Sequence, residues 1–235
     1  MIDKKKLISQ AAALGVNLSD NQAEQFDLFS RLLVETNEKF NLTAIKDPDE
    51  IVTKHLVDCL TLFPAVDFPE GAGVIDIGTG AGFPAVPLLI YRPDLKITAL
   101  DSTGKKLNFV ESAVSELGLS INLIHGRAEE YGRGDLRESF DFAVSRAVAS
   151  LNVLCEYCLP FVKTGGKFIS MKGSKADEEL ALSRTAVRTL GGRFTECREF
   201  TLADGIERNL VIIEKVSPTP PKYPRPSAQI SKKPL

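Results

Sequence analysis

The stretch VIDIGTGAGFP, residues 74–84, decides the fold of this chain. Its first four residues are an apolar run interrupted only by Asp76, which predicts a short buried strand. Glycines follow at three alternate positions, and after Pro84 the apolar run AVPLLI predicts a helix, whose first turn tolerates proline. The pattern is therefore a strand, a tight glycine turn and a helix. Glycine lets the backbone bend sharply and lets a ligand come close, because no Cβ stands in the way.

The spacing of these glycines separates two kinds of nucleotide-binding turn. The dinucleotide fingerprint G-x-G-x-x-G would place its third glycine at position 83, which is Phe83; the third glycine here is Gly82. An acid two residues before G-x-G-x-G, as Asp76 stands before Gly78, resembles the first motif of the S-adenosylmethionine-dependent methyltransferases. An ordinary βα turn in another doubly wound fold is the alternative. In either case, the helix N-terminus behind the turn favours an electronegative or anionic ligand.

The composition is typical of a globular protein. The 235 residues are 43% hydrophobic and 26% charged, enough for one α/β domain with extensions. No apolar run approaches the roughly 20 residues that a membrane-spanning helix needs, and the N-terminus lacks the apolar region of a signal peptide. We therefore expect a cytoplasmic protein with no membrane partner. The net charge of −2 neither requires nor excludes nucleic acid, so a polyanion would have to meet local basic patches.

The cysteines do not predict a disulfide or a metal site. They are scattered at positions 59, 155, 158 and 197, and structural disulfides are not expected in a chain of cytosolic type. Cys155 and Cys158 have the spacing of a metal-binding pair. No second pair of Cys or His accompanies them, however, and their neighbours predict a helix, so we expect buried thiols and no metal.

Residues 1–70 predict helices without strands. An amphipathic segment from residue 4 ends at Gly15, and Ser19 is a suitable N-cap for a second helix in which Phe26 and Phe29 recur at helical spacing. Asp47-Pro48 predicts the start of a third helix. We interpret residues 1–70 as a helical cap packed on the main domain.

Residues 71–216 alternate between strands and helices. The expected strands are 74–77, 96–100, 121–124, 142–144 and 167–171, and the expected helices are 83–91, 104–117, 151–161 and 176–190. Two further strands, 194–200 and 209–214, have no helix of usable length between them and predict a hairpin at one edge. The fold class is therefore α/β, with a Rossmann-like, mostly parallel sheet of seven strands and a terminal antiparallel hairpin. This is the layout of S-adenosylmethionine-dependent methyltransferases, whereas a dinucleotide-binding Rossmann domain would end in another βαβ crossover.

Residues 217–235 are a basic, proline-rich C-terminal tail with six prolines, four lysines or arginines and no acid. This composition predicts an extended or disordered segment. A solvated terminus and a contact to a phosphate backbone are both open.

Polar residues follow the predicted strands, at the edge where open α/β sheets bind ligands. Asp101 could accept hydrogen bonds from ribose hydroxyls, in a methyltransferase or an NAD enzyme, or could cap the next helix. Ala128 and Glu129 follow the third strand, where backbone groups of a methyltransferase would read adenine; a plain surface loop is the alternative. Arg146 and Lys172 follow the fourth and fifth strands and could hold a phosphate or the carboxylate of a cofactor, unless they are surface charges, which fits Lys172 better.

Seven short segments occur in the order typical of one family. They are NLT (41–43), HLVD (55–58), DIGTGAGFP (76–84), LDS (100–102), SRA (145–147), KG (172–173) and RNLVIIEK (208–215). The ordered set resembles the ribosomal RNA small subunit methyltransferase G family from about residue 41 to residue 215. The tail segment KYPR, 222–225, resembles one branch of that family. Asn209 stands where many relatives have histidine, at a position we consider peripheral.

This resemblance implies transfer of a methyl group from S-adenosylmethionine to N7 of a guanosine in the decoding-region loop of 16S rRNA. It places the cofactor contacts on Gly78, Phe83, Asp101, Ala128, Glu129 and Arg146. Guanine N7 has an in-plane lone pair and no proton, so its attack needs no general base, and we expect no catalytic acid or base. The chain accordingly lacks an Asn-Pro-Pro-Tyr-type motif and a Pro-Cys nucleophile. Catalysis would rest on in-line positioning, with negative groups offsetting the cationic product.

The partner implied by the resemblance is 16S rRNA. His55 and Asp58 lie three residues apart on one helical face, either at the mouth of the site near the RNA or as a mutually satisfied pair at the junction of helix and domain. The modest net charge favours a small ribosomal subunit or its assembly intermediate over bare RNA, and we expect a monomer. RNA phosphates would meet basic side chains, namely Lys4–Lys6, Lys105, Lys106, Arg127, Arg133, Arg137 and those of the tail.

Two functions of other classes stay open. A methyltransferase for a small molecule or a protein would have a closed apolar substrate pocket and no salt-dependent RNA binding. A non-catalytic binding protein would bind cofactor or RNA and transfer nothing. An NAD oxidoreductase is disfavoured by Phe83 and by the terminal hairpin.

Overall fold

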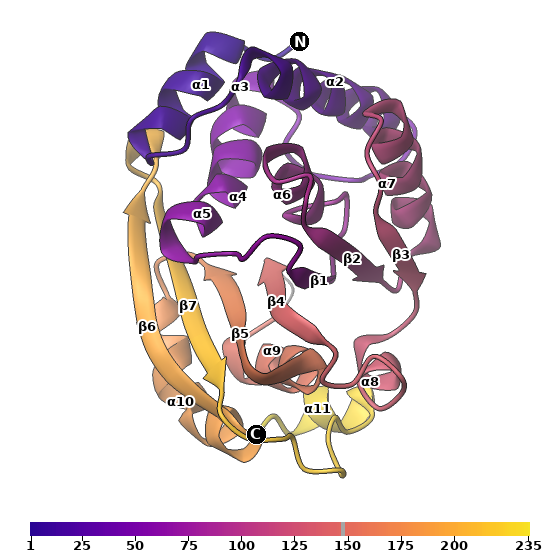
Figure 1. Cartoon of the computed structure of the whole chain (residues 1–235), viewed down its shortest axis with the longest axis vertical. Helices are drawn as coiled ribbons and strands as arrows, with labels where there is room; N and C mark the ends of the chain where they lie inside the picture. The colour runs from indigo at the N-terminus through magenta and orange to yellow at the C-terminus, as the bar shows by residue number, and fades with distance from the viewer. Residues whose placement is uncertain (147–148) are drawn as a thin grey trace.

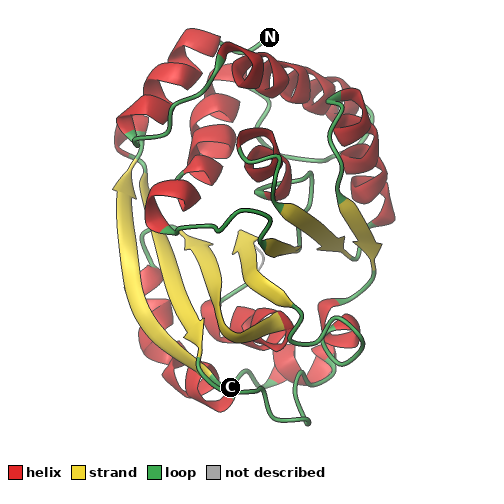
Figure 2. Cartoon of the chain, viewed as in Figure 1, coloured by secondary structure: helices red, strands yellow, loops and turns green. Residues whose placement is uncertain are grey.

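The computed structural model describes residues 1–146 and 149–235, which form one mixed sheet with helices on both faces (Figures 1 and 2). Within these residues the sheet has seven strands in the order β3-β2-β1-β4-β5-β7-β6. They are β1 (Gly73–Ile77), β2 (Lys96–Asp101), β3 (Asn122–His125), β4 (Phe140–Arg146), β5 (Val162–Lys172), β6 (Gly192–Thr201) and β7 (Glu207–Lys215). β1 to β5 pair in parallel, and β7 runs antiparallel to both β5 and β6. The expected α/β fold with its terminal hairpin is confirmed.

The residues before the sheet fold into helices whose starts follow the capping signals. The Ser19 hydroxyl accepts a hydrogen bond from the Gln22 backbone in a capping box, and the Asp47 carboxylate caps the helix that begins at Pro48. Both predicted starts are therefore confirmed. The helices are α1 (Lys4–Ala13), α2 (Asp20–Asn37), α3 (Pro48–Ile51), the π-helical segment η1 (Val52–Val57), α4 (Asp58–Leu60) and α5 (Leu62–Ala65).

The sheet separates two apolar clusters. One cluster joins the helices of residues 4–65 to α6 (Ala85–Tyr91) and α7 (Gly104–Glu116), and the other joins α9 (Leu151–Cys158) to α10 (Ala176–Thr189) (Figure 1). β1 shows the alternation, because Val74 belongs to the first cluster and Ile75 to the second. The N-terminal helices thus pack directly on the sheet side that carries α6 and α7. The domain boundaries at residues 70 and 216 stay predictions.

Residues 217–235, which we call the strap, are not extended or disordered as their composition predicts. The strap packs on the domain, buries Tyr223 and ends in α11 (Ser227–Lys232), whose Ile230 is fully buried. The reason lies elsewhere in the chain: Arg137 donates hydrogen bonds to strap carbonyls, and Arg133 donates to another. These two arginines are therefore engaged within the molecule, contrary to the expectation that they face RNA.

Smaller differences concern element boundaries. The segment after β3 contains the one-turn helix α8 (Ala128–Tyr131), where the sequence predicts a loop. The expected helix 151–161 ends as α9 at Cys158 and continues as the 3-10 turn η2 (Leu159–Phe161). A further 3-10 turn, η3 (Ala203–Gly205), joins β6 and β7. Ala147 of the SRA segment lies outside the described residues.

Candidate cofactor site

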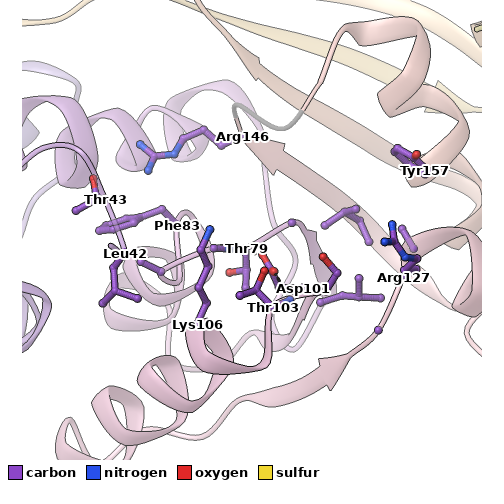
Figure 3. A pocket seen from close by; sticks show the side chains of 18 of the residues that line it. Leu42, Thr43, Thr79, Phe83, Asp101, Thr103, Lys106, Arg127, Arg146 and Tyr157 are labelled. Atoms are coloured by element: carbon purple, nitrogen blue, oxygen red, sulfur yellow. Dashed lines mark hydrogen bonds between the residues drawn. The ribbon is translucent and has the colours of Figure 1, made fainter. Parts of the chain in front are cut away.

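A cavity of about 470 Å³ opens at the carboxyl ends of β1, β2 and β4 (Figure 3). Leu42 and Thr43, in the loop between α2 and α3, complete one side together with His55 of η1. α8 and Tyr157 of α9 complete another side. Figure 3 shows Arg146 and Thr43 at one end of the cavity, Tyr157 and Arg127 at the other, and Asp101 between them. All six residues expected to contact a cofactor line this one cavity: Gly78, Phe83, Asp101, Ala128, Glu129 and Arg146.

The glycine turn supplies part of the cavity wall as bare backbone. Gly78 has φ +76° and Gly80 has φ +58°, a left-handed conformation that side chains rarely adopt. The Gly78 N–H donates to the Leu100 carbonyl at 2.8 Å, and the Gly80 N–H donates to Asp101 Oδ2 at 2.8 Å. These bonds tie the turn to the end of β2. The turn thereby leaves room for a ligand against its main chain.

Asp101 lines the cavity and binds the backbone on both sides of it, but it does not cap α7, whose N-cap is Thr103. Its Oδ1 accepts from the backbone of Thr103 at 2.8 Å, at the start of α7, while Oδ2 accepts from Gly80. Each carboxylate oxygen has a second lone pair, so Asp101 can still accept hydrogen bonds from a ligand in the cavity. Thr79 lines the cavity beside it with a buried hydroxyl that has no hydrogen-bond partner among the described residues.

Asp76 lies beneath the turn and does not line the cavity. Its carboxylate is fully buried, and Oδ2 accepts from the Ala85 backbone at 3.1 Å. Burial raises the pKa of Asp76 to about 7, because the charged form loses its hydration. Through its hydrogen bond with the Ala85 N–H, Asp76 connects β1 with the start of α6.

Arg146 faces the cavity but is also bound to the N-terminal helices. Its Nη1 donates to Asp58 Oδ2 at 3.0 Å and to the Lys54 carbonyl at 3.1 Å, and its Nη2 donates to His55 Nδ1 at 3.0 Å. The guanidinium carbon lies 4.9 Å from the centre of the Phe83 ring. These contacts leave the Nε–H and one Nη2–H of Arg146 for other partners.

His55 is held as a neutral ring. A guanidinium can only donate, so His55 Nδ1 is the acceptor from Arg146, and Nε2 carries the hydrogen and donates to Thr43 Oγ1 at 2.9 Å. The ring stacks on Phe83 with centroids 4.5 Å apart. Burial, followed by the positive charge of Arg146, lowers the pKa of His55 to about 3.

Asp58 and His55 are both satisfied, although not by each other. Asp58 is 3% exposed and accepts from Arg146 on one oxygen and from Arg208 Nε, at 3.0 Å, on the other. Arg146 bridges Asp58 to His55. The structure thus places the two residues at the junction of the N-terminal helices with β4 and β7, and His55 also lines the cavity.

Comparisons with known proteins identify the family. A family model described as rRNA small subunit methyltransferase G (GidB) matches residues 22–211. Ribosomal RNA small subunit methyltransferase G of Alkaliphilus metalliredigens is 48% identical over 225 residues, which cover 94% of both chains. The protein of that name from Brevibacillus brevis is 47% identical over 237 residues, which cover 99% of both chains. This chain belongs to the ribosomal RNA small subunit methyltransferase G family.

The fold of this methyltransferase is shared with more distant proteins of known structure. The crystal structure of M. jannaschii TYW2 in complex with AdoMet superposes with a TM-score of 0.51 at 15% sequence identity. The match covers 63% of this chain and 70% of that chain. The seven-stranded sheet and its helical layers are therefore those of Rossmann-like methyltransferases.

Several lining residues of the methyltransferase were not recognised as such from the sequence. Thr43 and Thr79 lie inside segments that carry the resemblance, but no pattern shows that these residues line a cavity. Tyr157 lies between the two buried cysteines of α9, where helical spacing alone does not show which side it faces. Arg127 and Lys106, which the sequence assigns to RNA, also line the cavity.

Lys172 is not a surface charge. It is 8% exposed, and its Nζ donates to the Ala149 carbonyl at 2.5 Å and pairs with Glu179 at 2.7 Å. It lines a second cavity, of about 560 Å³, which also contacts Arg146 and Arg208. Arg146 thus stands in the wall between the two cavities.

The remaining expectations concern thiols, metals and membranes. Cys155 and Cys158 are buried and unpaired, as expected of thiols on the inner side of α9. Among the described residues, no three His, Cys, Asp or Glu side chains gather as a metal site. No helix in the described ranges is long and apolar enough to cross a membrane.

Proposed function

We propose that this methyltransferase transfers a methyl group from S-adenosylmethionine to N7 of a guanosine in 16S rRNA. The observation that carries the proposal is that one cavity brings together the glycine turn, the acid at the end of β2, α8 and Arg146. The curated relatives are named for the small-subunit rRNA, and the TYW2 structure was solved with AdoMet. The names of the relatives support an rRNA substrate, and the TYW2 complex supports S-adenosylmethionine as the cofactor.

The residues of the cavity fit an adenosine-containing cofactor. Asp101 would accept from the ribose hydroxyls, and the main chain at Ala128 and Glu129 would meet the edge of the adenine. The bare backbone at Gly78 and Gly80 would lie against the rest of the ligand. The cofactor supplies an electrophilic sulfonium methyl group when it is bound. The residues of this chain would orient it and exclude water.

The titratable groups around the cavity support transfer without a general base. His55 uses both ring nitrogens in hydrogen bonds, and its pKa of about 3 keeps it from taking up a proton near neutral pH. Asp58 is held by two arginines. Asp76 has a raised pKa but lies below the turn. Such a site suits a methyl acceptor that has no proton to lose, such as guanine N7, because this acceptor needs no general base.

The RNA partner would approach where basic side chains reach the cavity. Arg127 and Lys106 line it, while Lys105 lies over the Phe40 ring at 5.3 Å. We propose a small ribosomal subunit or an assembly intermediate as the substrate, because the net charge of −2 gives little general attraction to bare RNA. Action in the cytoplasm and as a monomer belongs to the same proposal.

The test is transfer of labelled methyl from S-adenosylmethionine to small ribosomal subunits that lack the modification. The labelled nucleoside is identified by mass spectrometry, and subunits that already carry the modification are the control. The expected product is 7-methylguanosine in 16S rRNA, with no label added to the control subunits. If cofactor binds but no label enters RNA, the proposal fails and the acceptor is a small molecule or a protein.

A further inference from the structure

The strap crosses the molecule beside α8 and α9, at the end of the cavity that carries Tyr157. In Figure 1 it runs along the lower edge, and α11 lies next to α8 and α9. This course brings residues 217–235 against the two helices that form one wall of the cofactor cavity. The strap itself contributes no residue to that wall.

Two cations, one fully buried and one half-buried, connect the strap to the domain. The Lys215 ammonium is fully buried and donates to the carbonyls of Leu159 and Val162, at 2.7 and 3.2 Å, and to Thr219 Oγ1 at 2.8 Å. Arg137 donates to the carbonyls of Tyr223 and Thr219 at 2.8 and 2.5 Å. Without the strap, the buried Lys215 would lose its bond to Thr219, and Arg137 would lose its bonds to the strap carbonyls. The loss is costly at Lys215, because a buried charge needs hydrogen-bond partners.

A third connection joins the strap to α9. Glu156 is fully buried and accepts from three donors of Arg225: the backbone N–H at 2.7 Å, Nε at 2.8 and 3.2 Å to its two oxygens, and Nη2 at 2.6 Å. Glu156 precedes Tyr157, which lines the cavity. The ion pair therefore restrains the turn of α9 that presents Tyr157.

Strap residues also support α8 from behind. Tyr223 is 7% exposed and belongs to the same buried cluster as Ala128. Pro224 lies against Gly132 at the end of α8, where an added Cβ would come within 3.3 Å of the proline ring. Because α8 is a single turn, it has little stability of its own and takes its place from what packs on it.

We propose that the strap positions the adenosine end of the cofactor site, with Arg225 as the positioning residue. It acts through Glu156 on Tyr157, and through Tyr223 and Pro224 on α8. This inference rests on the proposed function, which places adenine at α8. The proposal also assigns the basic charge of Arg225 to the interior of the protein and not to an RNA phosphate.

The test compares two sets of strap variants in the full-length protein. Arg225→Ala removes the side-chain fork, Arg225→Lys keeps one charged donor, and the control replaces the exposed Lys222, Lys232 and Lys233 by alanine. Binding of S-adenosylhomocysteine is measured by calorimetry, and folding is followed by thermal unfolding. Arg225→Ala is expected to weaken binding about tenfold, Arg225→Lys less, and the triple-lysine control not measurably. In turnover, the KM for the cofactor rises in Arg225→Ala and kcat stays unchanged.

Several outcomes would overturn the proposal. If folded Arg225→Ala binds S-adenosylhomocysteine as tightly as the wild type, the strap only stabilises the fold. An equal loss in the triple-lysine control would make general charge the cause. If Arg225→Ala does not fold, hydrogen exchange of the wild type decides: binding must protect amides of both α8 and the strap. A wild type that binds no S-adenosylhomocysteine rejects the proposed function as well, whereas binding that ignores Arg225 rejects the strap proposal alone.

Discussion

Two buried carboxylates, Asp58 and Glu156, stand behind opposite ends of the same cavity, and arginine holds each of them. Asp58 shares its two oxygens between Arg146 and Arg208, and Arg146 also lines the cavity. Within the part of the chain that the structure describes, Glu156 accepts only from Arg225, through its guanidinium and its backbone N–H. The comparison teaches that one kind of ion pair serves two purposes. Both pairs join distant segments of the chain, but only the pair at Asp58 includes a residue that lines the cavity, Arg146. Under the proposed function, Asp58 would also orient Arg146 toward the cofactor.

The largest effect is expected from removing Asp58. Asp58→Ala leaves two guanidiniums close together without their carboxylate, so the free energy of unfolding should fall by about 3–5 kcal/mol. Methyl transfer should fall at least about 100-fold, because Arg146 loses its orientation. Urea unfolding and kcat/KM measure the two effects. Asp58→Asn keeps the shape and one acceptor, and it should lie between the alanine variant and the wild type. Transfer within a few-fold of the wild type in the alanine variant would refute the orienting role.

A charge-to-apolar exchange should separate the two ends. Arg225→Met alone leaves a buried carboxylate unpaired and should cost about 3 kcal/mol of unfolding free energy, while the double variant Glu156→Leu/Arg225→Met should regain at least half of that loss. The corresponding variants at the other end are Arg146→Met and Asp58→Leu/Arg146→Met. The double variant should regain less stability, because Arg208 also loses its carboxylate, and it should not regain methyl transfer. The measurements are urea unfolding and labelled-methyl transfer for all four proteins. Recovery of methyl transfer in the Asp58→Leu/Arg146→Met variant would show that the ion pair at this end, too, is needed only for stability.

The Asp58 end should also lose stability in acid through His55. Its pKa is about 3 in the folded protein and about 6.5 when unfolded, so below pH 6.5 the unfolded state binds a proton that the folded state does not. Stability from this group is thus present above pH 6.5 and is lost as the pH falls toward 3, by about 2 kcal/mol at pH 5. Urea unfolding at pH 7 and 5 measures it. His55→Gln should lose correspondingly less than the wild type, and equal losses would contradict the assignment.

The smallest effect separates the two contacts of His55. His55→Phe keeps an aromatic ring on Phe83 but loses both hydrogen bonds, so transfer should fall about tenfold. His55→Gln can accept from Arg146 and donate to Thr43, and it should retain more activity. Steady-state kinetics at saturating cofactor measures the difference. Better transfer by the phenylalanine variant would show that stacking, and not the hydrogen bond to Arg146, is what matters.

The sequence predicts the strands, helices and glycine turn of this molecule better than the contacts between residues that are far apart in the chain. The turn at Gly78 and the acid at Asp101 are local patterns with a physical reason, and alternating strands and helices predict the sheet around them. Their placement in one cavity follows, because the carboxyl ends of parallel strands meet at one edge. The roles of these residues toward the cofactor stay predictions.

The parts that the sequence missed depend on contacts between distant residues. Glu156 meets Arg225 across 69 residues, and Arg146 meets Asp58 across 88. Neither carboxylate differs locally from a solvated one, so no spacing announces its partner. The composition of the strap likewise predicts disorder, because its contacts with Lys215, Arg137 and Glu156 lie far away in the sequence or are not marked by any local pattern. α8 escaped prediction because four residues are too few to show a helical period.

The double role of Asp58 bears on the order in which the protein folds. Arg208 is 150 residues from Asp58 along the chain, and it reaches the carboxylate only after β7 has joined the sheet. Contacts of such separation close late, because ordering the intervening chain costs entropy before the contact returns any stability. β7 also supplies residues to both apolar clusters, so the pairing of Asp58 with Arg208 and the completion of the core depend on the same strand. The orientation of Arg146 by Asp58 is therefore complete only when β7, near the end of the chain, has paired with the sheet.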